Sequence, residues 1–290
     1  MFSKPILDYT GAELRAHLAG FVRDGLTTYI ETAAGVSALQ TTYFSDIRFP
    51  GVTSIVDGML RGWANSLQAI ASRQNNEGTD AIITLHMPQD GINYPFSVSD
   101  SGLFHAWLDL GEHQDIDQYM DMLERTLEQT DFEAMAASID RQADSLVDLG
   151  LKGAARDLCD FMNLTHRHMP AKLKAKGLEF EQYGGCSSEG LDRYHLQEGI
   201  RKNISSFVIA ERETGIDGLE DGFLAIARGL HGYSAIQEIP SRTTFGFGPV
   251  SAVTFKHKTR FTIAPDAADA LLSFIALHGD VELPNLKQAA

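Results

Sequence analysis

Two histidines and an aspartate come closest, by type and spacing, to a catalytic or metal-binding group in this chain. His105, Asp109 and His113 follow one another at four-residue intervals, so a continuous helix would place all three on one face. Metal sites on helices use that geometry, and such a site would make the protein a metal-dependent hydrolase or a nucleic-acid-modifying enzyme. However, Gly111 interrupts the segment, and the sequence defines no further ligand. A surface group without metal is therefore the preferred interpretation, and the enzyme is the alternative.

The other candidates for catalysis lack a complete motif. Cys186 and His195 could form a nucleophile and a base, but closeness in sequence does not bring two side chains together in space. The glycines in 184–185 and 246–248 do not follow the pattern that cradles phosphate between a strand and a helix. We therefore expect no enzyme activity, no cofactor and no bound metal.

The stretch 100–148 is strongly acidic. It holds thirteen aspartates and glutamates and two basic residues, a local net charge of −11 out of −15 for the whole chain. Two runs of acids in it have helical spacing: Asp117, Asp121, Glu124 and Glu128, then Asp140, Asp144 and Asp148. On a helix, neighbours in each run would lie about 5 to 6 Å apart on one side. Such a surface can compete with nucleic acid for a basic groove or bind a basic patch of a protein. A solvated face without a partner is the alternative.

Two stretches carry the opposite charge. Residues 152–176 have a net charge of +4, and 242–260 holds four cations and no acid: Arg242, Lys256, Lys258 and Arg260. Pairing of the acidic segment with a basic stretch of another subunit would give a homo-oligomer, and pairing within one chain is the alternative. Phe245 and Phe247 flank Gly246 beside these cations, where exposed aromatic side chains would act as interface anchors. Burial of the two rings, which would only hold the loop in place, is the more frequent alternative.

Composition narrows the classes of protein further. A pI near 5.0 argues against direct binding to nucleic acid or to anionic membranes. The chain has no run of about 18 apolar residues that could span a membrane, and its start lacks a signal pattern. Its two cysteines, Cys159 and Cys186, cannot form a disulfide framework. We expect a cytoplasmic protein, in the host cell if a phage encodes it.

The predicted elements indicate an α+β fold with antiparallel strands. A mixed segment 1–98 precedes an acidic helical segment 99–170 and a second mixed segment 171–290. The sequence predicts helices at 11–24, 55–75 and 217–230 and strands at 81–86, 93–98 and 178–183. Pro265 and Gly279 mark the start and end of a further helix at 266–278. Thr130 and Glu133 have the spacing of a capping box, opening a helix to about Asn163 with an interruption near Gly150 or Gly153. Residues 242–249 are expected to form an irregular loop, and 251–263 alternate as one strand or a hairpin.

Four features from Phe104 onward form a recognisable layout: Ala106-Trp107-Leu108, the acidic stretch, Gly150-Leu151-Lys152 leading into Leu158 and Phe161, and the ending 254–261. This layout resembles an uncharacterised phage- and plasmid-borne domain that is sometimes joined to DNA adenine methyltransferases. It implies a mobile-element setting, in which anti-defence proteins are common. Phage inhibitors of Gabija-type nuclease–helicase complexes are an example of similar size, with which the chain shares no motif.

Charge segregation without catalytic machinery leads to one expectation of function. The protein would be a homo-oligomeric phage or mobile-element anti-defence protein that inhibits a host nucleic-acid-processing complex by direct binding. The two acidic runs would supply electrostatic complementarity to the partner. Lys256, Lys258 and Arg260 would contact another subunit or the partner.

Overall fold

The computed structural model describes most of residues 2–85, a few residues between 86 and 129, and most of residues 130–280. The described residues are 2–40, 52–85, 87–89, 92–94, 120–121, 124, 127–128, 130–167, 169–185, 190–231 and 239–280. The chain divides into two compact units, 1–77 with 82–146 and 78–81 with 147–290, so the acidic segment 99–170 contributes to both. Helices accompany an antiparallel five-stranded sheet, which confirms the α+β class.

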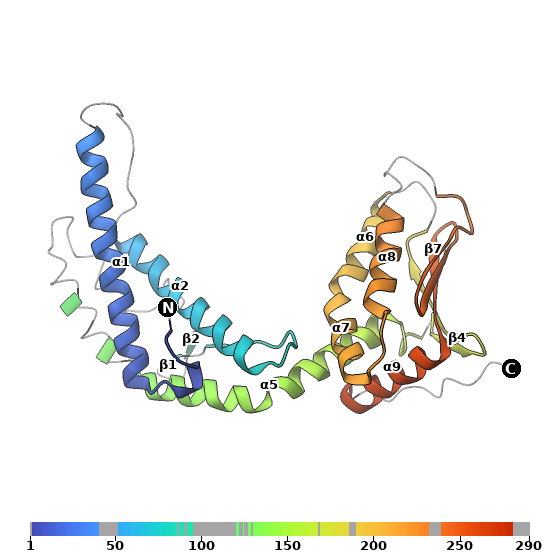
Figure 1. Ribbon diagram of the computed structural model, residues 1–290, viewed down its shortest axis with the longest axis horizontal. Coiled ribbons are helices and arrows are strands. Elements are labelled where there is room, and N and C mark those ends of the chain that lie inside the picture. Colours follow the sequence, from blue (N-terminus) through green and yellow to red (C-terminus); the bar gives the residue numbers. More distant parts are fainter. Residues whose placement is uncertain are drawn as a thin grey trace. The chain divides into compact units, whose positions relative to one another are not determined.

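The first unit is mainly helical. Its described elements are the 3₁₀ turn η1 (Ile6–Asp8), helices α1 (Gly11–Gln40) and α2 (Val52–Asn75), and the paired strands β1 (Met87–Gln89) and β2 (Ile92–Tyr94) (Figure 1). Thr10 and Glu13 form a reciprocal capping box at the start of α1. Hydrogen bonds from Lys4 and Thr10 lower the pKa of Glu13 to about 2. Both predicted helices are present, and α1 is longer than the apolar pattern indicated.

The segment after α2 is buried as predicted but is not a strand. Ile83 and Leu85 are buried, as alternation requires, yet residues 81–85 have no strand partner. Side chains of the neighbouring helices bond the backbone of Ile83 and Thr84 instead. The Oγ of Ser72 accepts the Ile83 N–H, and the Gln142 amide exchanges two hydrogen bonds with the backbone of Thr84. The prediction of a strand at 81–86 was therefore wrong over its described part.

Helix α5 (Phe132–Phe161) begins one residue later than a cap at Thr130 would require. Asp131 is the cap, because its Oδ1 accepts the N–H of Ala134 at 2.9 Å. Glu133 does not close the box, and its Oε1 instead accepts the N–H of Ala12 in the first turn of α1. The predicted Thr130–Glu133 capping box was therefore wrong in its partners.

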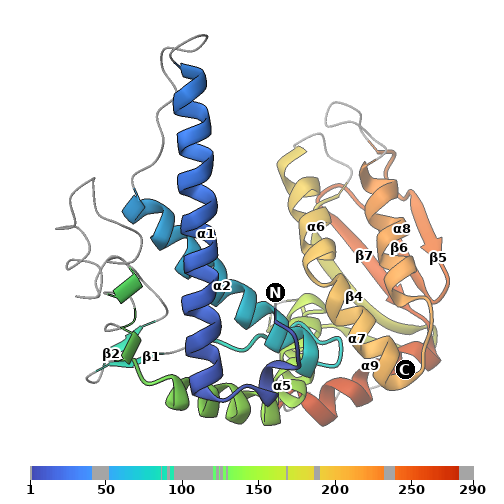
Figure 2. The same ribbon diagram turned by 60° about the vertical axis from the view of Figure 1, so that its left-hand side comes forward.

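The second unit is a sheet with helices on one face. Strands β3 (Lys172–Lys174), β4 (Gly177–Tyr183), β5 (Thr244–Phe247), β6 (Val250–Thr254) and β7 (Lys258–Ile263) pair antiparallel in the order β3-β4-β7-β6-β5. Helices α6 (Gly190–Lys202), α7 (Ile204–Thr214), α8 (Leu219–His231) and α9 (Pro265–His278) belong to the same unit. Figures 1 and 2 show α6, α7 and α8 along one side of this sheet.

Five phenylalanines form the centre of the core beneath the sheet. Phe180 of β4 and Phe261 of β7 stack with ring centroids 5.0 Å apart, and Phe207 of α7 stacks on Phe223 of α8 at 4.1 Å. Phe161, at the end of α5, meets all four rings edge-on. Such pairs add to the free energy gained from burying the rings.

The basic C-terminal stretch is a hairpin and not one long strand. β6 and β7 pair with Thr254 opposite Thr259, so the chain turns at 255–257. Residues 244–247, expected in a loop, form strand β5 on the edge of the sheet, with Phe245 opposite Ala252 of β6. The β6–β7 hairpin places alternate residues of β7 on opposite faces.

Two glycines of α5, Gly150 and Gly153, differ in how closely other atoms pack around them. The helix runs without interruption past both, although the sequence had indicated a break there. A Cβ added at Gly153 meets nothing within 4 Å, whereas one at Gly150 would lie 2.2 Å from Oγ1 of Thr79.

We expect Gly153→Ala to raise the free energy of unfolding by about 0.5 to 1 kcal/mol. Gly150→Ala should lower it by about 1 to 3 kcal/mol through overpacking. Urea unfolding measures both, and a change of the same sign in the two variants would contradict this packing.

Candidate functional site

The acidic side chains before α5 face outward. Met120 and Leu127 are buried, whereas Asp121, Glu124 and Glu128 are exposed. This is the arrangement that a helix with one apolar stripe produces. Asp117, the first member of the run, lies outside the described residues.

The acids on α5 are exposed as well. Asp140 and Asp144 belong to the first unit and Asp148 to the second, and all three side chains are accessible to solvent. Within the described ranges, none of the three forms an ion pair or side-chain hydrogen bond. Exposed like charges at four-residue spacing cost a helix only a few tenths of a kcal/mol, so the fold tolerates them without counterions.

Glu128 borders two hollows beside the first turns of α1, and Glu124 borders one of them. One has a volume of about 190 Å³, and small side chains of α1 line it, including Ala12 and Ala16. The other is an open hollow of about 410 Å³ bordered by Glu128, Asp131 and Glu133. Arg15 lines both. Carboxylates at the rim and small apolar residues beneath suit the aliphatic stem and charged end of a lysine or arginine side chain.

The basic residues of β7 are paired within the chain. Both carboxylate oxygens of Glu181 on β4 are used: Nζ of Lys258 lies 2.7 Å from Oε2, and Nη2 and Nε of Arg260 lie 2.8 and 3.0 Å from Oε1. Partial burial alone would raise the pKa of Glu181, but these two cations outweigh burial and hold its pKa below the usual range. Lys256 is exposed in the turn and has no ion pair among the described residues.

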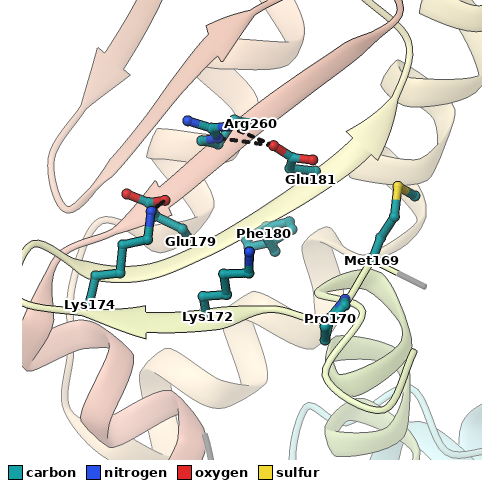
Figure 3. Close-up of a pocket in the computed structure, with 8 residues that line it drawn as sticks. All are labelled: Met169, Pro170, Lys172, Lys174, Glu179, Phe180, Glu181 and Arg260. Atoms are coloured by element: carbon teal, nitrogen blue, oxygen red, sulfur yellow. Dashed lines mark hydrogen bonds and ion pairs between the residues drawn. The ribbon is translucent and has the colours of Figure 1, made fainter. Parts of the chain in front are cut away.

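A pocket of about 150 Å³ opens beside the Glu181 pair (Figure 3). Lys172 and Lys174 come from β3, Glu179 and Glu181 from β4, and Arg260 from β7. Lys174 pairs with Glu179, whereas Lys172 has no ion-pair partner in the described part of the chain. Met169 and Pro170 close the side of the pocket that precedes β3. This pocket was not predicted, because it depends on the register of β4 with its two neighbours.

The two candidate aromatic anchors behave differently. Phe245 is half-buried against α8, where its ring occupies the space beside Gly229. Phe247 is 55 % exposed on the edge strand. Tyr183, which sequence reasoning did not single out, is 70 % exposed at the end of β4. Phe247 and Tyr183 thus have the exposure that an interface anchor needs, and Phe245 is mainly a core residue.

The alternative enzyme site lies outside what the structure describes. His105, Asp109, His113 and Cys186 are not among the described residues, so the alternative of a metal-dependent enzyme stays a prediction. His195 is exposed on α6. The described ranges contain no group of three or more histidine, cysteine, aspartate or glutamate side chains that could hold a metal ion. None of the helices in those ranges is long and apolar enough to cross a membrane.

The ion pairs of Glu181 with Lys258 and Arg260 should make the stability of the protein depend on pH. Because the folded-state pKa of Glu181 is lowered, its stabilisation is present above the ordinary glutamate pKa and is lost as pH falls through the folded-state value. We expect Glu181→Gln to lower the free energy of unfolding by about 1 kcal/mol at neutral pH, with a smaller difference below about pH 4. Denaturant melts across this pH range measure it. Glu198→Gln, which breaks an exposed pair with Arg201, is the control and should change stability by only a few tenths of a kcal/mol. An equal loss in the two variants at neutral pH would show that the Glu181 pair is an ordinary surface pair.

Comparison of the chain with protein-family models, curated proteins and solved structures found no match.

Proposed function

We propose that the protein is a non-enzymatic interaction protein that forms a homo-oligomer and binds a basic surface of another protein complex. In its finer form, the proposal is a phage or mobile-element anti-defence protein acting in the host cytoplasm. It inhibits a nucleic-acid-processing defence complex by covering the basic surface that would receive nucleic acid. The resemblance of the chain from Phe104 onward supports the mobile-element setting.

The observation that carries the proposal is the unpaired acidic rim beside α1. Glu124 and Glu128 are exposed, border a hollow and have no ion-pair partner among the described residues. A partner that inserts a lysine or arginine there would gain a charge-assisted hydrogen bond without breaking an existing one. Asp121 stands beside them on the same exposed side.

Charge of this kind acts mainly on the rate and selectivity of association. Acidic patches steer a basic partner and can raise association rate constants by 10-fold or more at low salt. The same surface repels nucleic acid, so the complex would bind the protein or its nucleic acid, but not both, at one basic groove. Inhibition by occlusion needs no catalytic residue.

Reversing the acidic rim tests the proposal. In bacteria carrying a Gabija-type nuclease–helicase complex, expression of the unmodified protein should restore phage plating. E124K/E128K should lose most of this effect, because two lysines at the rim would repel a basic partner. The matched control is D24K/E31K, which makes the same change of net charge at exposed positions of α1 away from the hollows.

The outcomes separate the parts of the proposal. Circular dichroism of the purified variants checks that both remain folded, as substitution of exposed residues predicts. Plating that stays low with the unmodified protein would contradict inhibition of this class of complex. Equal plating with E124K/E128K and the control would contradict the assignment of the acidic rim as the binding surface.

A further inference from the structure

The two faces of the five-stranded sheet differ: one face packs against the hydrophobic core, and the other has charged side chains. Alternation buries Phe180, Phe261 and Ile263 beneath the sheet, and it places the intervening residues of β4 and β7 on the opposite face. We call this opposite side the open sheet face. Its charged residues are Lys172, Lys174, Glu179, Glu181, Lys258 and Arg260.

The open sheet face keeps a positive excess after all its internal pairs are made. Its four cations face two carboxylates, which leaves a net charge of +2. Glu181 is shared by Lys258 and Arg260, so one carboxylate neutralises only one of two cations. Lys172 remains without an ion-pair partner in the described residues, and Lys256 adds a further exposed cation at the β6–β7 turn. This excess stands out in a chain whose net charge is −15.

The same face has the aromatic and arginine side chains that anchor protein interfaces. Tyr183 shares the parity of Glu179 and Glu181 on β4 and is 70 % exposed. The guanidinium of Arg260 lies 5.1 Å from the ring centroid of Phe255, which holds it over the sheet. Tyrosine and arginine are enriched among the residues that contribute most to binding energy. The pocket of about 150 Å³ lies next to this group and offers room for a partner side chain.

The spacing of the cations matches that of the acids on α5. Alternate residues of a strand, such as Lys258 and Arg260, lie about 6.6 to 6.8 Å apart on one face. Asp140 and Asp144 lie about 6 Å apart along the helix axis. A helix laid along β7 or β3 can therefore oppose two carboxylates to two cations in register.

We propose that the open sheet face binds the acidic side of α5 of a second copy of this chain. The inference rests on the homo-oligomer of the proposed function and specifies its interface. The second copy is favoured over nucleic acid because a nucleic acid strand continues beyond this face, over the rest of a chain with a charge of −15. The helix of a second copy brings only a short run of carboxylates, Asp140, Asp144 and Asp148.

The interface joins two different surfaces, so it is heterologous. Each copy offers one acidic side and one open sheet face, and repetition closes a ring or continues as a chain of subunits. Because the contact is largely electrostatic, salt weakens it: the Debye length falls from about 10 Å at 0.1 M to about 3 Å at 1 M.

Two charge-reversal variants of the full-length chain test the interface. D140K/D144K reverses the acidic side of α5. K172E/K256E reverses Lys172 on the open sheet face and Lys256 in the β6–β7 turn, neither of which has an ion pair in the described residues. The controls D160K/D269K and R156E/R228E change net charge equally at exposed helix positions elsewhere. Light scattering after size-exclusion chromatography, at about 0.05 and 0.5 M NaCl, gives the mass of each species.

The unmodified protein and both controls should assemble at low salt and dissociate at high salt. Each test variant alone should dissociate about 10- to 100-fold more readily, because its two surfaces then carry like charge. An equimolar mixture of the two test variants should assemble again, since each supplies the surface that the other has lost. A mere loss of folding in either variant could not produce this recovery.

Three results would overturn the inference: a monomeric unmodified protein at both salt concentrations, assembly of either test variant alone, or a mixture that stays monomeric. Binding of labelled oligo(dT) that K172E/K256E abolishes, without any assembly, would assign the face to nucleic acid instead. The proposed function is judged separately, because E124K/E128K should lose inhibition and still assemble. Inhibition that survives in D140K/D144K without assembly would leave the acidic rim as the functional surface of a monomer.

Discussion

The buried alternation of β4 and β7 is the constraint from which the rest of the second unit follows. Phe161 contacts the rings of both strands and of α7 and α8, so the core closes only when Phe180 and Phe261 point toward it. A one-residue slip of either strand would move its whole apolar set to solvent. The core thereby fixes the opposite face too, and Glu181 and Arg260 meet there because their neighbours in sequence are buried.

This constraint explains why the cations of β7 form ion pairs within the chain whereas the acids of α5 do not in the described residues. The cations of β7 lie on a sheet, where cross-strand neighbours are close enough to pair, and Glu181 neutralises part of their charge. The acids of α5 lie on an exposed side of the helix, and neither Asp140 nor Asp144 forms an ion pair within the described residues, although Arg141 lies close by on the same helix. The acidic surface therefore keeps nearly its full charge, and the basic one keeps an excess.

Local patterns predicted several of the elements, but they missed α6, α7 and β5 and did not predict the partners of the elements. Apolar periodicity located α2, α8 and α9, and it showed that Ile83 would be buried. It could not show that Ser72 and Gln142 bond the backbone of Ile83 and Thr84, because an extended segment bonded by side chains has the same alternation as a strand. The Glu181–Arg260 pair joins positions 79 residues apart, and only strand register reveals it. The exposed acids were predictable because exposure on a helix is a local property.

The two proposed contacts, one between subunits and one with a basic partner, should differ in strength because their charged groups differ in internal pairing. A carboxylate of Asp140 that approaches Arg260 must share that cation with Glu181, which limits the gain at each subunit contact. A lysine or arginine of another protein that enters the hollow beside Glu124 meets carboxylates that form no ion pair in the described residues, although Arg15 lines the same hollow. Contact between subunits should therefore be weaker and more salt-sensitive than binding of a strongly basic groove. A chain built in this way can remain reversibly assembled and still keep its strongest interaction for a basic partner.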